Sequence, residues 1–189
     1  MGALTLSRLQ RGYGRLYMAQ RKPREAVAAM AKAVYCAAQC GGPEGLGTAS
    51  SFYGLGCALL TLHEQQVQTH QASPAAASFV GDELEAASGL DAVHACFDKV
   101  VHIFAAHVRG DLSPSPPELV QGQQKPRKAA SGDLAGAPTS PVGRFSPNEV
   151  RAAEEMLRGV AAIRTRHCGA LHTSVADALA ALAAVLSSY

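Results

Sequence analysis

The sequence contains no Trp, and Phe, Tyr and Trp together make up only 5% of its 189 residues. Apolar residues nonetheless account for 48% of the chain, and alanine supplies much of that share. Alanine is the best helix former and few β-branched residues compete with it, so the composition predicts closely packed helices rather than strands. A core built from such small side chains is expected to be thin.

Motifs of catalysis and metal binding are also missing. No Gly-x-Ser-x-Gly turn presents a nucleophile, and no Cys-x-x-Cys pair begins a zinc site. Gly12-Tyr13-Gly14 lacks the third glycine and the preceding strand of a phosphate-binding loop. Cys36 and Cys40 lie one helical turn apart, but two thiolates are half of a structural zinc site. We therefore expect no enzyme activity, no metal and no cofactor, and seven histidines with structural or solvated roles.

The chain has neither a strong net charge nor a long apolar run. A formal net charge of +2 creates no field that attracts nucleic acid. Charged residues interrupt each apolar stretch before it could span a bilayer, and no secretory leader is recognisable. The chain has five cysteines, an odd number that cannot all pair in disulfides, which favours reduced thiols. These features predict a soluble cytoplasmic protein without a membrane or nucleic-acid partner.

The first 35 positions hold small and large residues at the spacing that lets two short antiparallel helices interlock: Gly14, Tyr17, Ala26, Met30 and Ala33. The small residues allow close approach of the backbones, with Gly14 expected to pack against Ala26, and the large ones fill the space opposite. This spacing is typical of the tetratricopeptide unit, a 34-residue helix pair. Gly56 and Leu59 repeat the relation of Gly14 and Tyr17. We expect an all-α solenoid of about three imperfect helix pairs.

Apolar periodicity and turn residues predict six helices, at residues 6–20, 24–39, 47–63, 90–108, 146–166 and 173–188. The positions expected to face inward on the first, fourth and last helices are Leu6, Leu9, Tyr13, Leu16 and Tyr17; Val93, Phe97, Val100 and Phe104; and Val175, Leu179, Leu182 and Leu186. On the fifth helix they are Val150, Ala153, Met156, Leu157, Val160 and Ile163. A competing register of the fourth helix, through Ala92 and Cys96, stays open.

Two breaks divide these helices. Residues 66–89 are rich in Gln, Ser, Ala and Gly, which predicts a partly disordered insertion in the helix-pair region 1–109. Residues 110–147 hold seven of the ten prolines and the basic cluster Lys125, Arg127 and Lys128, which predicts a flexible linker or, within it, a short docking motif. A C-terminal helix pair would occupy 148–189. The Ala-rich sides of its last helix favour a chain cut short over a polar cap.

Several local motifs follow one another in this order. They are a Gly-x-x-Tyr helix at Gly14, a Glu-Ala turn exit at Glu25, Val34-Tyr35 at a helix end, a Gly-rich loop, and Ser51-Phe52-Tyr53. Together with residues 97–103, 148–157 and 163–164, this order resembles the helical-repeat part of the axonemal zinc-finger MYND-domain protein family. The resemblance implies a tetratricopeptide fold, a place in the ciliary or flagellar axoneme and protein partners of the inner dynein arms. The family's zinc module has no counterpart in this chain.

A second resemblance concerns the end of the chain. Residues 171–176 open with a His-x-x-Val-Ala helix start that is similar to kinesin-light-chain-type repeats. That likeness implies a generic cytosolic adaptor as the alternative function. A cochaperone adaptor is less favoured, because Gly54 stands where a carboxylate-gripping Asn is required.

The candidate partner-binding residues lie on the first helix of each predicted pair. Arg8, Arg11 and Arg15 form a basic ridge on the first helix, and such helices commonly line the concave face of a solenoid. With Tyr13 and Tyr53 they would contact a partner helix or an extended peptide. A solvated ridge without a partner is the open alternative. The sequence therefore predicts a non-enzymatic protein-binding scaffold.

Overall fold

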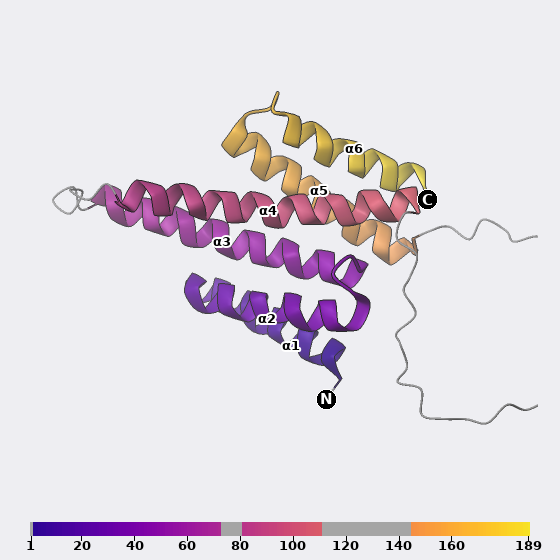
Figure 1. Cartoon of the computed structure of the whole chain (residues 1–189), viewed down its shortest axis with the longest axis horizontal. Coiled ribbons are helices and arrows are strands. Elements are labelled where there is room, and N and C mark those ends of the chain that lie inside the picture. The colour runs from indigo at the N-terminus through magenta and orange to yellow at the C-terminus, as the bar shows by residue number, and fades with distance from the viewer. Residues whose placement is uncertain (1, 73–80, 111–144) are drawn as a thin grey trace, which may run out of the picture.

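The computed structural model describes residues 2–72, 81–110 and 145–189, with side chains given outside 70–88, and its elements are all helices (Figure 1). In chain order they are α1 (Ala3–Ala19), α2 (Pro23–Gly41), α3 (Leu46–Ala72), α4 (Gly81–Arg109), α5 (Pro147–Cys168) and α6 (Thr173–Ser187). The prediction of an all-α chain is confirmed, since the described ranges contain no strand. No helix in these ranges is long and apolar enough to cross a membrane.

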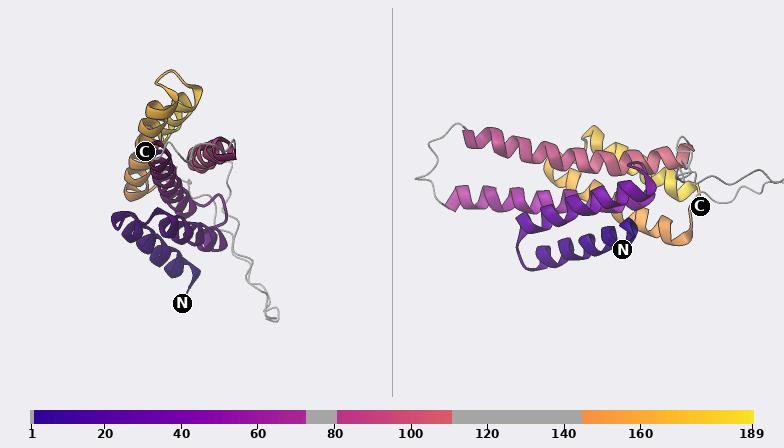
Figure 2. Two further views of the ribbon diagram at one scale, coloured as in Figure 1. Left: turned by 90° about the vertical axis from the view of Figure 1, so that its left-hand side faces the viewer. Right: turned by 60° about the horizontal axis from the view of Figure 1, so that its bottom comes forward.

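Consecutive helices run antiparallel, and the three pairs lie beside one another in chain order. Viewed end-on, α1 and α2 occupy one end, α3 and α4 the middle, and α5 and α6 the other end (Figure 2). Helix α2 packs against α3, and α6 packs against α4. The helices α3 and α4 therefore connect the two outer pairs.

The helix boundaries follow from local capping chemistry. Pro23 occupies the first turn of α2, where its missing amide hydrogen costs nothing, and Gly42 ends α2 with a φ of 77° that favours glycine. Ser146 begins α5 with a capping box, in which its side chain accepts from the Glu149 amide and the Glu149 carboxylate accepts from the Ser146 amide. Gly169, with a φ of 90°, separates α5 from α6.

The main core lies between α3, α4, α5 and α6. Its buried members are Ala49, Leu60, Val93, Phe97, Val100, Ile103, Phe104, Phe145, Val150, Ala153, Met156, Leu157, Val160, Ala161, Ala178, Ala181, Leu182 and Val185. All four residues of the predicted stripe on the fourth helix belong to this core, whereas Ala92 is exposed. The register through Val93 is thus the observed one, although Cys96 is buried beside it.

A second, smaller core joins α1 and α2 to α3. Ala26, Met30 and Ala58 are buried there, and Tyr17, Met18, Val27 and Leu55 pack partly buried around them. Small residues bring the helices of this region close together, as the Ser7 hydroxyl shows by donating to the Ala33 carbonyl oxygen at 2.9 Å. The Ala33 side chain is fully buried beneath this contact.

The predicted insertion at 66–89 is wrong for most of its length. Helix α3 continues to Ala72 and α4 begins at Gly81, so residues 66–72 and 81–89 are helical; residues 73–80 lie outside the described part. Alanine and glutamine favour helices even without a large apolar face, so low hydrophobicity did not require disorder. Similarly, Phe145 belongs to the predicted linker 110–147, but its side chain is buried, and its ring centroid lies 6.4 Å from that of His107. Residues 111–144 of that linker are not described.

The predicted inward face of α1 is wrong, and that of α6 is correct for Val175 and Leu182 only. Leu6, Leu9, Tyr13 and Leu16 of α1 are 37–50% exposed, whereas Ser7 and Gly14 are the buried residues of that helix. On α6, Leu179 and Leu186 are exposed, and Ala178, Ala181 and Val185 are buried with Val175 and Leu182. An outermost helix has neighbours on one side only, and on α1 close packing places the small residues Ser7 and Gly14 on that side.

Candidate functional site

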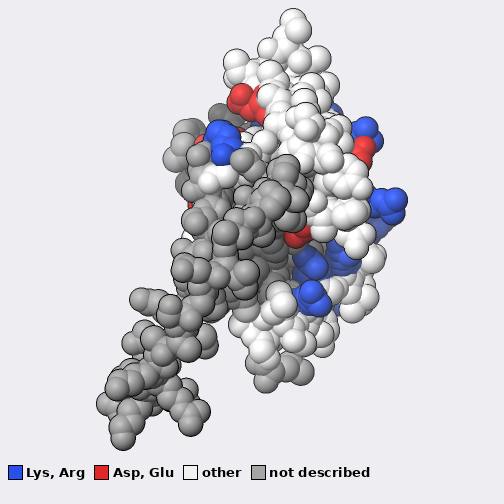
Figure 3. Space-filling view, turned by 90° about the vertical axis from the view of Figure 1, so that its right-hand side faces the viewer, with Lys and Arg blue, Asp and Glu red and all other residues white. Residues whose placement is uncertain are grey.

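A groove of about 810 Å³ lies where α1, α3 and α5, the first helices of the three pairs, come together. The lining residues are Leu4, Ser7, Arg8, Arg11 and Arg15 of α1; Ala37, Cys40 and Gly41 of α2; Leu46, Gly47, Thr48, Ser50 and Tyr53 of α3; Phe104 of α4; and Asn148, Glu149, Ala152, Glu155 and Met156 of α5. Figure 3 views the molecule from the end at which these helices begin, and Lys and Arg atoms gather there close to acidic atoms. The groove therefore offers charge of both signs around an apolar floor.

The α1 wall carries three arginines. Arg8, Arg11 and Arg15 recur at intervals of three and four residues, so they share one side of the helix. The Arg11 guanidinium is half-buried and donates to the Ser50 hydroxyl of α3. Burial, followed by repulsion from Arg15 and Arg8, lowers the pKa of Arg11 below its ordinary value. None of the three forms an ion pair within the described ranges, so no described carboxylate pairs with this positive wall.

Tyr53 of α3 forms part of the groove floor and fixes α5 beside it. Its hydroxyl lies directly against Gly159, where a methyl group would clash, and its ring centroid is 6.1 Å from that of Phe97. Burial, together with the neighbouring Cys57 and Glu155, raises the pKa of Tyr53 to about 12. Tyr53 is therefore neutral at physiological pH and contributes an aromatic surface with a hydrogen-bonding hydroxyl.

The α5 wall carries the carboxylates. The Glu149 carboxylate accepts from both the amide and the hydroxyl of Ser146, and these bonds lower its pKa. Glu155 is exposed and makes no ion pair with a described residue. Asn148 and Met156 complete this wall. The two long walls thus differ in sign: positive on α1 and negative on α5.

Four of the five predicted partner-binding residues line this groove: Arg8, Arg11, Arg15 and Tyr53. Tyr13 does not line the groove; its ring stacks on Tyr17 at a centroid distance of 6.4 Å and an angle of 27°. Sequence reasoning missed the α5 wall. Asn148, Ala152, Glu155 and Gly159 recur at intervals of three and four, the same signal that singled out the arginines.

The predicted packing residues occupy contacts between helices. A methyl group at Gly14 would lie 2.7 Å from Met30, and one at Gly56 would lie 2.7 Å from the Phe97 ring. Gly54 also faces Met30, at 2.9 Å, so this side chain fills the space between α1 and α3. The others are buried or partly buried: Ala26, Ala33 and Val100 fully, Tyr17 and Leu59 in part. The partner of Gly14 is Met30 rather than Ala26.

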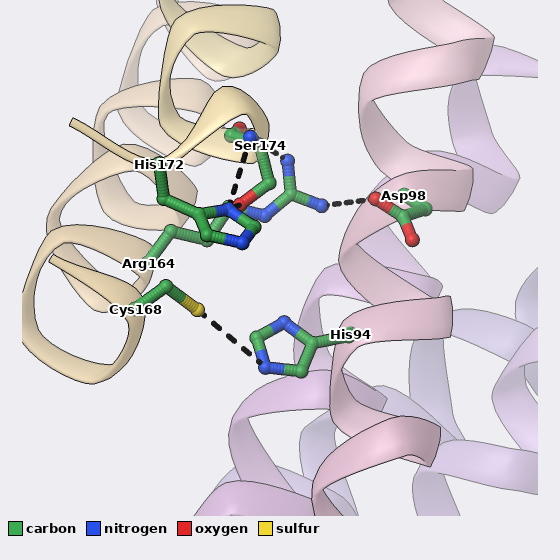
Figure 4. Close-up of polar contacts among 6 residues, drawn as sticks. All are labelled: His94, Asp98, Arg164, Cys168, His172 and Ser174. Atoms are coloured by element: carbon green, nitrogen blue, oxygen red, sulfur yellow. Dashed lines mark hydrogen bonds and ion pairs between the residues drawn. The ribbon is translucent and has the colours of Figure 1, made fainter. Parts of the chain in front are cut away.

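A separate polar cluster links α4, α5 and α6 (Figure 4). Arg164 of α5 is 1% exposed, pairs with Asp98 of α4 and donates to the Ser174 carbonyl oxygen of α6 at 2.8 Å. A buried charge requires such partners, and here they connect three helices. The sequence analysis missed this residue, because an arginine within an apolar stripe resembles an exposed position.

Beside this cluster, the Cys168 sulfur lies 3.8 Å from His94 Nε2. A nucleophilic cysteine needs a base that a third group orients, and among the residues with defined positions none hydrogen-bonds to His94 in that way. All five cysteines are free thiols. Among the residues with defined positions, no three His, Cys, Asp or Glu side chains gather as metal ligands would. The cluster is best explained as a structural link.

Comparison of the chain with protein-family models, curated proteins and solved structures gives no match.

Proposed function

We propose that this chain is a non-enzymatic protein-binding scaffold with a tetratricopeptide-like arrangement of helix pairs. The observation that carries the proposal is the groove, because its two long walls and much of its floor come from the first helices of the three pairs, α1, α5 and α3. Solenoids of paired helices bind partners on the surface formed by those helices. Stacked antiparallel pairs and the contacts at Gly14 and Gly56 support the same arrangement.

The partner would be a helix or an extended segment lying across α1, α3 and α5. Tyr53, Phe104 and Met156 offer apolar surface at the floor, and charged side chains border it on both sides. This division is typical of protein recognition sites, in which a central apolar contact supplies most of the binding energy and polar edges set orientation. The mechanism is presentation of a preformed surface, without chemistry on the partner.

The cellular setting that we propose is the ciliary or flagellar axoneme, near the inner dynein arms. The resemblance of residues 12–60, 97–103 and 148–157 to the axonemal family supports this setting. The alternative is a cytosolic adaptor, which the kinesin-light-chain-like residues 171–176 support. A tagged full-length chain in ciliated cells separates the two: retention in detergent-extracted axonemes favours the first, and free cytosolic label favours the second.

Site-specific photo-crosslinking tests the binding surface itself. A photoreactive residue replaces Ala152, which is exposed in the groove, or Ala176, which is exposed on α6 outside it. We expect discrete crosslinked partners from position 152 and none of those partners from position 176. Equal adducts from both positions, or none from position 152, would contradict a partner-binding groove.

A further inference from the structure

We infer that the groove recognises an acidic, carboxylate-rich segment of a partner protein, which lies along α1 and is held by Arg8, Arg11 and Arg15. This inference rests on the proposed binding function and specifies the chemistry of the partner. It starts from three like charges on one wall that the described part of the chain leaves without a counter-charge.

The cost of this arrangement in the free protein is the first argument. Arg11 is half-buried between Arg8 and Arg15, and its partner is a neutral hydroxyl, that of Ser50. Removing a guanidinium from water and placing it near two others is unfavourable unless a negative group compensates. A ligand that supplies carboxylates would compensate the desolvation of Arg11 and the repulsion from its two neighbours.

The opposite wall argues that the ligand is a peptide and not a polyanion such as nucleic acid. Glu155 and Glu149 lie across the groove from the arginines, and the Glu149 carboxylate already accepts hydrogen bonds from Ser146. A strand of phosphates filling the groove would meet these carboxylates. A protein segment can place acidic side chains toward α1 and apolar or basic ones toward the floor and α5. The modest net charge of +2 agrees with local rather than global attraction.

The length of the positive wall sets the length of the segment. Arg8 and Arg15 are seven residues apart, which corresponds to about 10 Å along a helix axis. An extended chain covers that distance in about three residues. Two or three carboxylates within four or five residues would therefore face all three guanidinium groups. Guanidinium–carboxylate contacts are charge-assisted and can be bidentate, which gives selectivity for carboxylates over neutral amides.

The test measures binding of labelled 12-residue peptides to the full-length chain by fluorescence anisotropy. The peptides share their apolar residues and carry Glu, Gln, Lys or phosphoserine at the same alternating positions; a single-stranded oligonucleotide is a further probe. We expect the Glu peptide to bind about tenfold or more tightly than the Gln peptide at about 0.05 M salt, and this advantage to shrink at about 0.5 M salt.

The double variant Arg8→Gln/Arg15→Gln supplies the specific test, because both side chains are exposed and their removal leaves the fold intact. It should weaken the Glu peptide about tenfold and leave the Gln peptide unchanged. The matched control Arg24→Gln/Arg151→Gln removes the same charge from exposed positions outside the groove and should change neither peptide. Equal loss in both variants would mean attraction by net charge alone and would overturn the inference.

The other outcomes are also decisive. Equal binding of Glu and Gln peptides overturns the acidic preference while the scaffold function stands. Binding of the phosphoserine peptide alone assigns the wall to phosphate rather than carboxylate, and preferred binding of the oligonucleotide overturns the peptide assignment. Partners crosslinked at position 152 that carry no acidic segment would likewise overturn the inference. If no partner at all is crosslinked at position 152, the proposed scaffold function itself is contradicted, so the two failures are distinguishable.

Discussion

The junction of α1 and α2 with α3 and the bundle of α3 to α6 use different kinds of contact. The junction is built from Ala26, Ala58 and Met30, and α1 leaves its large apolar residues exposed. The bundle buries Phe97, Ile103, Phe104 and Leu157 between four helices. Apolar area removed from water supplies most of the stability of a fold, so the bundle should hold most of this chain's free energy of unfolding. The junction contributes close approach and an accessible face.

The glycines of the two regions face different kinds of side chain. Gly14 faces the flexible Met30 side chain in the junction, and Gly56 faces the rigid Phe97 ring in the bundle. Both glycines allow two helices to touch, but only one of them faces a neighbour that can move aside. The regions should therefore respond differently to the same chemical change.

The largest effect is expected from Phe97→Ala in the bundle. This ring is fully buried between α3, α4 and α5, so its loss should lower the free energy of unfolding by about 3–5 kcal/mol. Urea denaturation followed by circular dichroism measures the change. Ala95, exposed on the same helix, supplies the control: Ala95→Ser should cost well under 1 kcal/mol. A loss below about 1 kcal/mol for Phe97→Ala would mean that the bundle is not the main core.

A series of three alanine substitutions sharpens the comparison between the glycines. Gly56→Ala should cost about 1–3 kcal/mol, because its new methyl group would lie 2.7 Å from Phe97. Gly14→Ala should cost less, about 1 kcal/mol or below, because the flexible end of Met30 can shift within the space that Gly54 also borders, and alanine gains helix propensity of about 1 kcal/mol. Gly12→Ala, with nothing within 4 Å, should stabilise by about 0.5–1 kcal/mol. The same denaturation curves apply, and an equal response at Gly14 and Gly56 would refute the distinction.

A substitution in the capping box tests how the first turn of α5 is stabilised. Ser146→Ala should cost about 1 kcal/mol at neutral pH, because two hydrogen bonds with Glu149 are lost. The Ser146 amide and then the Ser146 hydroxyl lower the pKa of Glu149 by donating to its carboxylate, and alanine removes only the hydroxyl. The contribution of that hydroxyl–carboxylate bond is present above the ordinary pKa of a glutamate. It disappears as the pH falls through the lowered value. Stability measured from neutral to acidic pH should show a smaller difference between the two proteins in acid, where only the bond from the Glu149 amide to the Ser146 hydroxyl still separates them. A difference that does not change with pH would contradict this origin.

The smallest effect is expected at the outer face of α1. Leu9→Gln and Leu16→Gln should each change the free energy of unfolding by about 0.5 kcal/mol or less, since both side chains are 42–50% exposed. Denaturation at several protein concentrations checks this value. A loss above about 1.5 kcal/mol, or one that depends on concentration, would show that another surface covers this face of α1 in solution.

The predictions made from local pattern hold best in the bundle. Val93, Phe97, Val100 and Phe104 were correctly placed inward, because large apolar residues at helical spacing on a central helix have a neighbour to meet on that side. The same reasoning failed for Leu9 and Leu16 of α1. A helix at the end of a stack has no neighbour on one face, and its amphipathic pattern does not reveal which apolar stripe lies on that face.

The residues that line the groove also differ in whether they could be predicted from local sequence. Arg8, Arg11 and Arg15 could be found from spacing along one helix, and Tyr53 from the repeat relation between the first two pairs. Glu155 and Met156 could not, because about 140 residues separate them from the arginines and no local pattern records that α5 lies beside α1 and α3. Arg164 was missed for a related reason. Its burial depends on Asp98 and Ser174, which belong to two other helices.

The amino-acid order alone determined the all-α class, the approximate positions of six helices, the caps at Pro23, Gly42 and Ser146, and the shared side of the three arginines. These properties depend on interactions within a few residues, so a local pattern encodes them. The tertiary structure decided which face of each helix is buried, how far α3 and α4 extend, and which walls form the groove. Burial and cavities arise from the packing of distant segments, and their free energy exists only once those segments are together.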